Sequence, residues 1–429
     1  MVNDQTARRR ELERAGREQL QRLQLSRLNQ LLEQILPGNQ FYAQKLSGIN
    51  LPLESLDQLS SLPMTSKQEL VTGNPDSDHA ANLTFPVDQY QRVHRTSGTR
   101  GRPMIVLDTD QDWQWWLDTW QFVLDVADVT AADRALMAFS FGPFIGFWSA
   151  HEAVLNRGAS SVPAGGMSSE ARLELLEQVD ATIVFCTPTY ALRLAEVARQ
   201  QGLDLAAGSV SRIVVAGEHG GSLPAIRNRI EAAWGARVID HAGATEVGPW
   251  GYPDSQGKGL HIVESEFIAE FISVETGQEA VQGELSDLVL TTLGRTGSPL
   301  IRYQTGDRVR PRWDEEVTNQ FVFLEGGVIG RADDMLIIRG VNIFPGSVEE
   351  ILRGFPEVDE YRLVATREGE MDQLAVEVED PLGQPGRIAD ELELQLGLKV
   401  AVTAVEAGSL PRSDAKGERF VDQREDPTR

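Results

Sequence analysis

The chain has 429 residues, of which 41% are hydrophobic and 24% charged, a composition typical of a folded protein with two or three domains. Its 40 Lys and Arg against 64 Asp and Glu give a net charge of −24, so an average surface patch repels nucleic acid and anionic lipid. We therefore expect no nucleic-acid and no membrane partner. A single cysteine, Cys186, excludes an intramolecular disulfide, and the lack of a signal-peptide pattern predicts a cytoplasmic protein.

The N-terminal region contains a helical pattern. Leu28, Leu31, Leu32 and Ile35 recur at helical spacing, and Pro37-Gly38 ends the pattern. These positions predict one amphipathic helix over residues 12–36 that packs on the body of the protein.

The segment "HRTSGTRGRP", residues 94–103, combines glycines, hydroxyls and arginines. Glycines let backbone amides approach an oxyanion closely, and hydroxyls and guanidinium groups add donors. The residues concerned are Thr96, Ser97, Gly98, Thr99, Arg100, Gly101 and Arg102. The segment lacks a Walker motif, and alone it fits both a phosphate-binding loop and a solvated turn. A short extended run and a Trp-rich helical pattern from about residue 110 follow it.

The middle of the chain repeats an apolar run, a turn of small residues and a helical pattern. "TIVFC" precedes "TPTY", "RIVVA" precedes "GEHGGSLP", and "ARVID" precedes "HAGATE". This alternation predicts parallel strands with crossover helices, whose following turns meet at one crevice. The polar residues expected there include Gly217, Glu218, Thr245 and Glu246.

The pattern changes again toward the C-terminus. Short alternating runs between residues 255 and 325 predict an antiparallel, distorted barrel-like β region. A compact α/β unit follows. We therefore predict an α/β protein with a large N-terminal domain, residues 1–330, and a small C-terminal domain, residues 331–429.

Five motifs occur in order: "TSGTRGRP", "HAGATEVG", "YQTGDRV", "GRADDMLIIRGVNIFP" and "LPRSDAKGERFVDQR". Together they resemble the signature of the adenylate-forming acyl-CoA ligase superfamily, and most closely the phenylacetate–CoA ligase family. The resemblance implies that MgATP converts a carboxylic acid into an acyl-adenylate, which the thiol of coenzyme A then attacks. It implies ATP, Mg²⁺ and coenzyme A as cofactors and cosubstrates, and dimers occur in this family.

The resemblance also assigns roles to residues of the large domain. Asp307 would accept hydrogen bonds from the ribose, Arg331 would contact the nucleotide, and Gly217 and Glu218 would border adenine. Thr245 would lie on the phosphate side, and Glu246 would be the carboxylate associated with Mg²⁺. The full nucleotide set that the resemblance implies is Thr96, Ser97, Gly98, Thr99, Arg100, Gly101, Gly217, Glu218, Asp240, His241, Ala242, Gly243, Asp307 and Arg331.

In the C-terminal domain, Lys416 matches the family's catalytic lysine, whose ammonium neutralises charge between the attacking carboxylate and the α-phosphate. Asp333 matches the hinge about which the small domain moves between the two half-reactions. Arg339, Gly340 and Val341 would lie on the face presented to coenzyme A.

The chain departs from the family at Ala242, where relatives carry a Tyr that stacks on adenine. Such stacking contributes about 0.5 to 1.5 kcal/mol, so adenine affinity would fall about tenfold unless another ring compensates. His241 could supply that ring or belong to the core. Arg100 and Arg102 replace the Thr and Lys common in relatives. A planar guanidinium in place of an ammonium could alter how the triphosphate sits.

The acyl pocket is expected to be apolar and to suit an aryl or arylacetic acid. Its expected lining is Phe141, Phe144, Ile145, Phe147, Tyr190 and Ala242. The leading hypothesis is an AMP-forming acid–CoA ligase. Two alternatives stay open: transfer of the acyl group to an amine or carrier-protein thiol, and a non-catalytic homologue that binds a nucleotide or acyl ligand.

Overall fold

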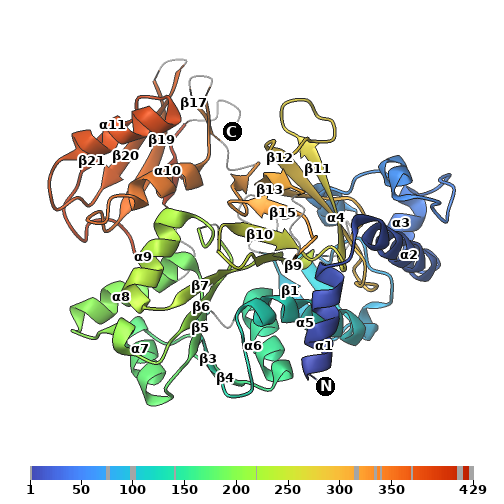
Figure 1. Ribbon diagram of the computed structural model, residues 1–429. Helices are drawn as coiled ribbons and strands as arrows, with labels where there is room; N and C mark the ends of the chain where they lie inside the picture. Colours follow the sequence, from blue (N-terminus) through green and yellow to red (C-terminus); the bar gives the residue numbers. More distant parts are fainter. Residues whose placement is uncertain are drawn as a thin grey trace.

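A computed structural model of the chain describes residues 2–73, 78–96, 103–139, 142–218, 220–313, 318–332, 336–338, 341–368, 371–412 and 419–424. Figure 1 shows a large body formed by the N-terminal three quarters of the chain, with a smaller C-terminal unit beside it. Within these ranges, none of the helices combines the length and the apolar character needed to cross a bilayer.

A parallel sheet of five strands organises the large body, with strand order β4-β3-β5-β6-β7. Its strands are β3 (Arg134–Met137), β4 (Ser160–Pro163), β5 (Ile183–Cys186), β6 (Arg212–Val215) and β7 (Arg237–Asp240). Each neighbouring pair is parallel, which confirms the strands predicted in "TIVFC", "RIVVA" and "ARVID".

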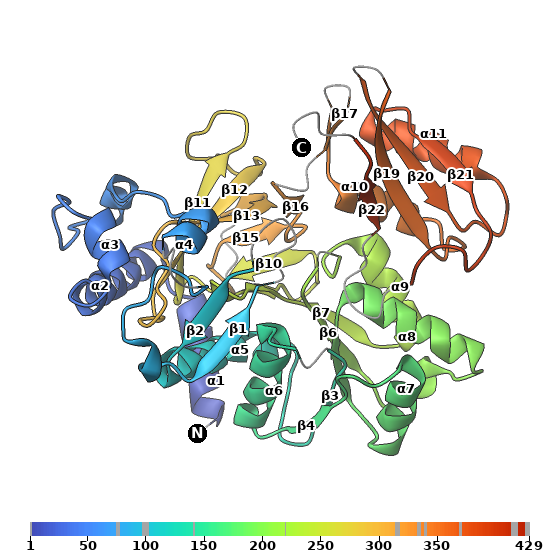
Figure 2. The same ribbon diagram turned by 180° about the vertical axis from the view of Figure 1, so that it is seen from behind.

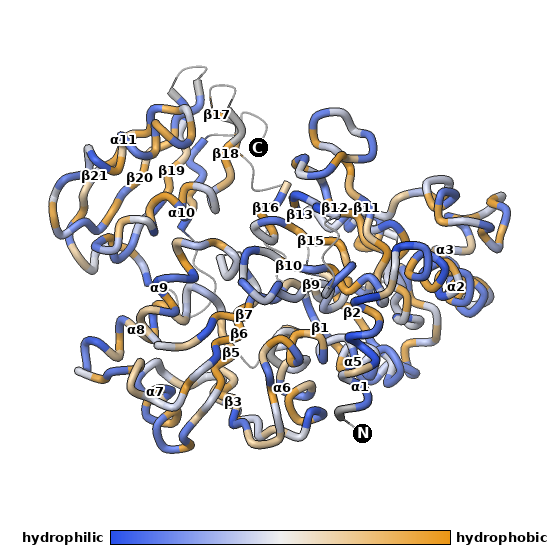
Figure 3. The backbone as a smooth tube through the Cα atoms, viewed as in Figure 1, coloured by the Kyte–Doolittle hydropathy of each residue, from blue (hydrophilic) through white to orange (hydrophobic). Residues whose placement is uncertain are grey.

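Helices cover both faces of this sheet. Ile183 and Phe185 of β5 face a core with α5 (Asp110–Val126) and α6 (Ile145–Arg157). Val184 and Cys186 face the opposite core, which the remaining crossover helices complete. Those helices are α7 (Ser169–Gln178), α8 (Pro188–Gln200) and α9 (Pro224–Trp234). Because both faces are covered, the strands read as continuous apolar runs, and the tube in Figure 3 is orange along β5 to β7.

Two antiparallel sheets contain the predicted β region, residues 255–325, but extend beyond it, from Ala242 to Arg331. The five-stranded sheet has the order β14-β15-β10-β9-β8, with β8 (Ala242–Ala244), β9 (Gly248–Pro253), β10 (Gly259–Ile262), β14 (Pro311–Arg312) and β15 (Phe323–Glu325). The four-stranded sheet has the order β11-β12-β13-β16, with β11 (Phe267–Ser273), β12 (Ser286–Thr292), β13 (Tyr303–Val309) and β16 (Gly330–Arg331).

The N-terminal segment differs from the prediction. Two helices, α1 (Val2–Glu13) and α2 (Arg17–Ile35), stand where one helix over residues 12–36 was expected, so that prediction is wrong at its N-terminal end. Gly16 adopts an extended backbone, φ −61 and ψ 153, and begins the second helix as its N-cap. Arg17 then pairs with Glu264 at 2.7 Å, which fixes the direction of α2. The predicted apolar face of α2 is buried. The short helices α3 (Gln40–Lys45) and α4 (Lys67–Thr72) follow.

The strands on either side of the glycine- and hydroxyl-rich segment, β1 (Arg92–Arg95) and β2 (Ile105–Asp108), form an antiparallel pair. Figure 2 shows this hairpin beside α5 and α6. Helix α5 then begins at Thr109, whose side chain forms a capping box with Asp112.

The C-terminal unit has a sheet of order β21-β20-β19-β22 and a hydrophobic core separate from those of the large body. Its elements are β17 (Leu336–Ile338), β18 (Val341–Ile343), α10 (Pro345–Arg353), β19 (Tyr361–Glu368), β20 (Met371–Val378), α11 (Pro385–Leu396), β21 (Ala401–Ala404) and β22 (Phe420–Asp422). Helix α10 packs against α9 of the large body (Figure 1). The exact division at residues 330 and 331 stays a prediction.

Candidate active site

The hairpin loop is closed at its base by Thr96 and Met104. Thr96 donates its amide to the Met104 carbonyl, and its hydroxyl accepts the Met104 amide, both at 3.0 Å. Arg95 donates to the carbonyl of Pro143 at 2.8 Å, which ties the hairpin to the segment before α6. Ser97, Gly98, Thr99, Arg100, Gly101 and Arg102 lie outside the described residues, so their phosphate role stays a prediction.

The turns that follow β5, β6 and β7 meet at one edge of the parallel sheet. The amide of Thr189, at the start of α8, donates to Glu218 Oε1 at 2.8 Å. Ser222 Oγ donates to Asp240 Oδ2 at 2.5 Å and so joins the turn after β6 to the end of β7. Gly217 has a φ of 93, a left-handed conformation that favours glycine. Ligands of open α/β sheets bind at such an edge.

Arg295 fixes the backbone of the turn that carries Thr245 and Glu246. Its guanidinium donates to the carbonyl oxygens of both residues. The Arg295 Nε atom donates to Asp108 Oδ1 at 2.8 Å, and both side chains are fully buried. Asp108 ends β2, so this ion pair links the hairpin to the Thr245–Glu246 turn.

The carboxylate of Glu246 is itself held by two side chains. The Tyr303 hydroxyl donates to Oε1 at 2.9 Å, and Lys67 Nζ lies 3.4 Å from the same oxygen. Burial, together with the negative charge of Glu246, raises the pKa of Tyr303 well above its usual range, so the phenol stays a donor. A parallel bridge between Thr65 and Tyr303 brings the start of α4, and with it Lys67, to this place.

Asp307 and Arg331 lie opposite each other on β13 and β16. Arg331 Nη1 is 3.0 Å from Asp307 Oδ1, and Arg331 Nη2 donates to the Thr305 carbonyl at 3.2 Å. The Arg331 side chain is 43% exposed, so it can also reach a ligand. Gly306, directly before Asp307 in β13, has a φ of 78, and a Cβ there would meet the Arg331 guanidinium at 2.8 Å.

The residues expected in the acyl pocket have different surroundings. Tyr190, in the first turn of α8, is buried in the core, with its hydroxyl 3.0 Å from Ser169 Oγ. Phe144 and Ile145 lie at the start of α6, and Ala242 begins β8. Phe141 and the side chain of Phe147 lie outside the described residues.

His241 is 7% exposed, and its ring centroid lies 4.2 Å from that of Trp120. Its Nδ1 atom donates to the Gly251 carbonyl at 2.8 Å, and burial lowers its pKa to about 4. Because the ring is buried and packs against Trp120, His241 fits the alternative in which it belongs to the core better than the one in which it stacks on adenine.

Of the C-terminal residues expected to act, Lys416, Asp333, Arg339 and Gly340 lie outside the described residues, and Val341 begins β18. Arg419, which follows Lys416 closely, contacts the edge of the parallel sheet: its Nη1 donates to Thr189 Oγ1 at 3.1 Å. It also pairs with Glu360 and Glu349 of its own unit.

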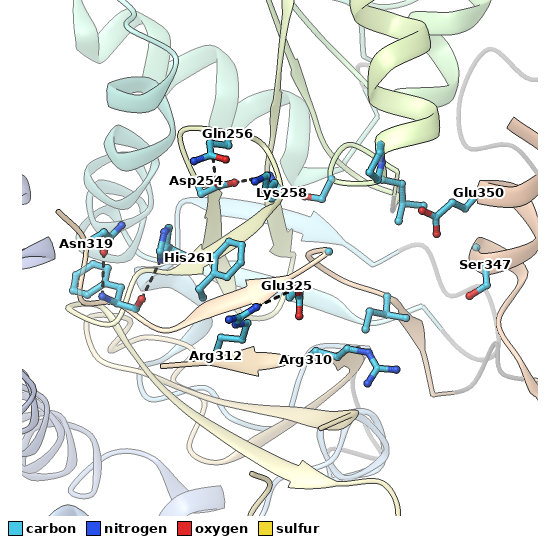
Figure 4. A pocket seen from close by; sticks show the side chains of 18 residues that line it. Asp254, Gln256, Lys258, His261, Arg310, Arg312, Asn319, Glu325, Ser347 and Glu350 are labelled. Atoms are coloured by element: carbon cyan, nitrogen blue, oxygen red, sulfur yellow. Dashed lines mark hydrogen bonds and ion pairs between the residues drawn. The ribbon is translucent and has the colours of Figure 1, made fainter. Parts of the chain in front are cut away.

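A separate cavity of about 720 Å³ lies between the β9–β10 region and α10 (Figure 4). Its polar lining includes Lys258, Arg310 and Arg312, and Arg312 pairs with Glu325 at 3.3 Å. Thr245, Glu246, Asp307 and Arg331 do not line it. The cavity is therefore distinct from the nucleotide site that the sequence predicts.

Sequence reasoning missed Lys67, Tyr303 and Arg295. Each acts through a partner far away along the chain, such as Asp108 for Arg295. Tyr303 stands beside the "TGD" motif and could have been noticed there, whereas the other two carry no local signal.

The comparisons with known proteins show the family to which the chain belongs. The model of the AMP-binding enzyme C-terminal domain matches residues 340–424. The chain is 30% identical to the phenylacetate-coenzyme A ligase of Thermus thermophilus, over 96% of this chain and 99% of that protein. The chain belongs to the phenylacetate–CoA ligase family. The Escherichia coli member is 31% identical, over 96% of this chain and 97% of its own length.

A solved 2-hydroxyisobutyryl-CoA ligase is similar to the chain at 26% identity. In its postadenylation state the match covers 96% of this chain and 91% of that one, with a TM-score of 0.89. In its thioesterification state, with CoA bound, the TM-score is 0.71 over 96% and 92%. The two structures are of the same ligase at the same sequence identity to this chain, so the difference in TM-score reflects a difference in conformation. The chain is therefore more similar in its overall arrangement to the postadenylation structure of that ligase than to its thioesterification structure.

Proposed function

We propose that the protein is an AMP-forming acid–CoA ligase that activates a small aromatic, phenylacetate-like carboxylate with MgATP and transfers it to coenzyme A. The observation that carries this proposal is that defined contacts hold the family-matching residues in place. Glu246 is held by Tyr303, the backbone at Thr245 is held by Arg295, and Asp307 faces Arg331. A cytoplasmic location and a homodimer stay predictions.

In the first half-reaction, the nucleotide binds across the edge of the parallel sheet. Asp307 accepts hydrogen bonds from the ribose hydroxyls, since a carboxylate is an acceptor with two oxygens. Arg331, which is already oriented by Asp307 and the Thr305 carbonyl, contacts the nucleotide with its exposed side. Gly217 and Glu218 border the adenine.

The residues at the phosphate end fit a magnesium ion carried by ATP. Mg²⁺ prefers oxygen ligands and keeps several waters, so one carboxylate with phosphate oxygens suffices. Glu246 would hold the ion, which neutralises charge on the phosphates when bound. Lys67 places a second positive charge beside Glu246. The hairpin loop and Thr245 complete the phosphate contacts.

Lys416 acts where the substrate carboxylate attacks the α-phosphate, and its ammonium stabilises the negative charge that develops there. Pyrophosphate leaves, and the acyl-adenylate stays bound. The small domain then rotates about Asp333, which removes Lys416 and presents Arg339, Gly340 and Val341 to coenzyme A. The thiolate attacks the acyl carbon, AMP leaves with the bonding electrons of the mixed anhydride, and a thioester forms.

A pyrophosphate-release screen tests the proposal. Aryl, arylacetic and aliphatic acids are supplied with MgATP, with and without coenzyme A, and the thioester is measured by mass spectrometry. We expect pyrophosphate and thioester with at least one small aromatic acid. Pyrophosphate without thioester would point to an amine or carrier-protein thiol as acceptor. No pyrophosphate with any acid would make the protein a non-catalytic homologue.

A further inference from the structure

His241 lies between the end of β7 and the start of β8, four residues before Thr245. Its ring is 7% exposed and packs against Trp120, which in turn lies beside Phe185 of β5. One side of the buried ring therefore contacts an aromatic cluster. A polar ring atom in such surroundings is costly unless it finds a hydrogen-bond partner.

The hydrogen bond to Gly251 determines which ring nitrogen carries the proton. A carbonyl oxygen only accepts, so Nδ1 must donate across the 2.8 Å contact. Because burial lowers the pKa of the ring to about 4, the ring holds a single proton near neutral pH. Its Nε2 atom is therefore an acceptor with an available lone pair.

Nothing in the described part of the chain donates a hydrogen bond to Nε2 of His241. Gly243 of β8 lies close to this nitrogen, because a Cβ added there would be 3.3 Å from Nε2. Gly243 is exposed and carries no side chain, so this edge of the ring is not covered from that position.

We propose that His241 is a specificity residue of the acyl site, and that its Nε2 accepts a hydrogen bond from a hydroxyl or amino group on the substrate acid. The substrate class is then a hydroxy or amino carboxylic acid rather than a purely hydrocarbon one. The inference rests on the proposed ligase function and deepens it. Acids without a donor leave Nε2 desolvated and unpaired, which discriminates against them.

Matched acids that differ only in the donor test this inference. The pairs are phenylacetate with its α-hydroxy and α-amino derivatives, isobutyrate with 2-hydroxyisobutyrate, and benzoate with 2-hydroxybenzoate and 2-aminobenzoate. We expect kcat/KM for pyrophosphate release to be about tenfold to hundredfold higher for the donor-bearing member of at least one pair. Comparison of the hydroxy and amino members identifies the donor. Ratios near or below one in every pair would overturn the inference.

His241→Asn is the matched variant, because its side-chain amide nitrogen can take the place of Nδ1 and keep the bond to Gly251, while nothing replaces Nε2. In this variant, the ratio of kcat/KM between the donor-bearing acid and its partner should fall to about one. The melting temperature should stay at the wild-type value. An unchanged preference in folded His241→Asn contradicts the proposal. A purely structural role predicts equal losses for both members of a pair.

A second measurement does not depend on a variant. In histidine-labelled wild type, the ¹⁵N resonance of His241 Nε2 should shift upfield when the preferred acid binds, because its lone pair becomes engaged. An unmoved resonance at saturation contradicts the proposal. Failure of the ligase assignment looks different: no acid in the panel would release pyrophosphate. Release without dependence on the donor contradicts only the role of His241.

Discussion

The guanidinium of Arg419 donates a hydrogen bond to the hydroxyl of Thr189, at 3.1 Å, and so joins the C-terminal unit to the edge of the parallel sheet. Thr189 belongs to the first turn of α8, where its amide also holds Glu218. Arg199 and Arg412 reach across the same boundary, to Asp359 at 3.7 Å and Glu196 at 3.8 Å. These contacts join the two units in an arrangement that is similar to the postadenylation structure of the 2-hydroxyisobutyryl-CoA ligase.

Arg419→Ala should therefore impair adenylation selectively. Arg419 holds the segment that follows Lys416 against the large body, so its loss should slow pyrophosphate release about tenfold, the equivalent of one lost charged hydrogen bond. Thioester formation from supplied acyl-adenylate should change less than about twofold. Stopped-flow measurement of each half-reaction provides the comparison.

Arg424→Ala is the control for this prediction. Arg424 forms ion pairs only with Asp372 and Asp422 of its own unit among the contacts described. Both half-reactions should be preserved in this variant. Equal slowing of the two half-reactions by Arg419→Ala would indicate a general loss of structure instead.

Glu246→Gln should raise the magnesium requirement. The amide keeps the shape of the side chain and its bond to Tyr303, but removes the charge that the ion needs. The Mg²⁺ concentration for half-maximal pyrophosphate release should rise about tenfold or more. Glu325→Gln, in the separate cavity, is the control and should leave that concentration unchanged. If both variants gave the wild-type value, Glu246 would have no role in holding the ion.

Arg295→Met should destabilise the protein strongly. It leaves Asp108 as an uncompensated, fully buried charge and frees the carbonyl oxygens of Thr245 and Glu246. Removing one partner of a buried pair costs about 3 to 5 kcal/mol of unfolding free energy. Urea denaturation measures this loss. Arg310→Met should change stability by less than about 0.5 kcal/mol, because that side chain is exposed.

His241 should make the fold sensitive to acid. Its pKa is about 4 in the native state against an ordinary value near 6.5, so the unfolded chain binds more protons between these limits. Stability should therefore fall as the pH drops from 6.5 to 4, by about 3 kcal/mol from this residue. The difference in unfolding free energy between wild type and His241→Asn, measured across that window, isolates the contribution. If the difference in unfolding free energy between the two proteins did not change with pH, His241 would make no such contribution.

The parallel core could be predicted from sequence because its signals are local. Ile183–Cys186 is a continuous apolar run followed by a small-residue turn, and this pattern alone predicts a strand covered on both faces. The break between α1 and α2 at Gly16 could not be predicted, because a glycine in a helical pattern is compatible with both a continuous and an interrupted helix.

The site was predictable only in part. Motif resemblance assigns roles to Thr245, Glu246, Asp307 and Arg331, and these roles stay predictions. The structure shows the first two held by residues from elsewhere in the chain. Those supports depend on distant pairings, such as Lys67 with Glu246 and Arg295 with Asp108, which no periodicity reveals. The burial of His241 against Trp120 is likewise a tertiary contact.

The most direct test of the account is the split between half-reactions in Lys416→Ala. Pyrophosphate release from the acid and MgATP is measured beside thioester formation from synthetic acyl-adenylate and coenzyme A. The account predicts that adenylation is abolished while thioester formation stays close to the wild-type rate. Equal loss of both steps would contradict a lysine that acts in the first half-reaction and withdraws for the second.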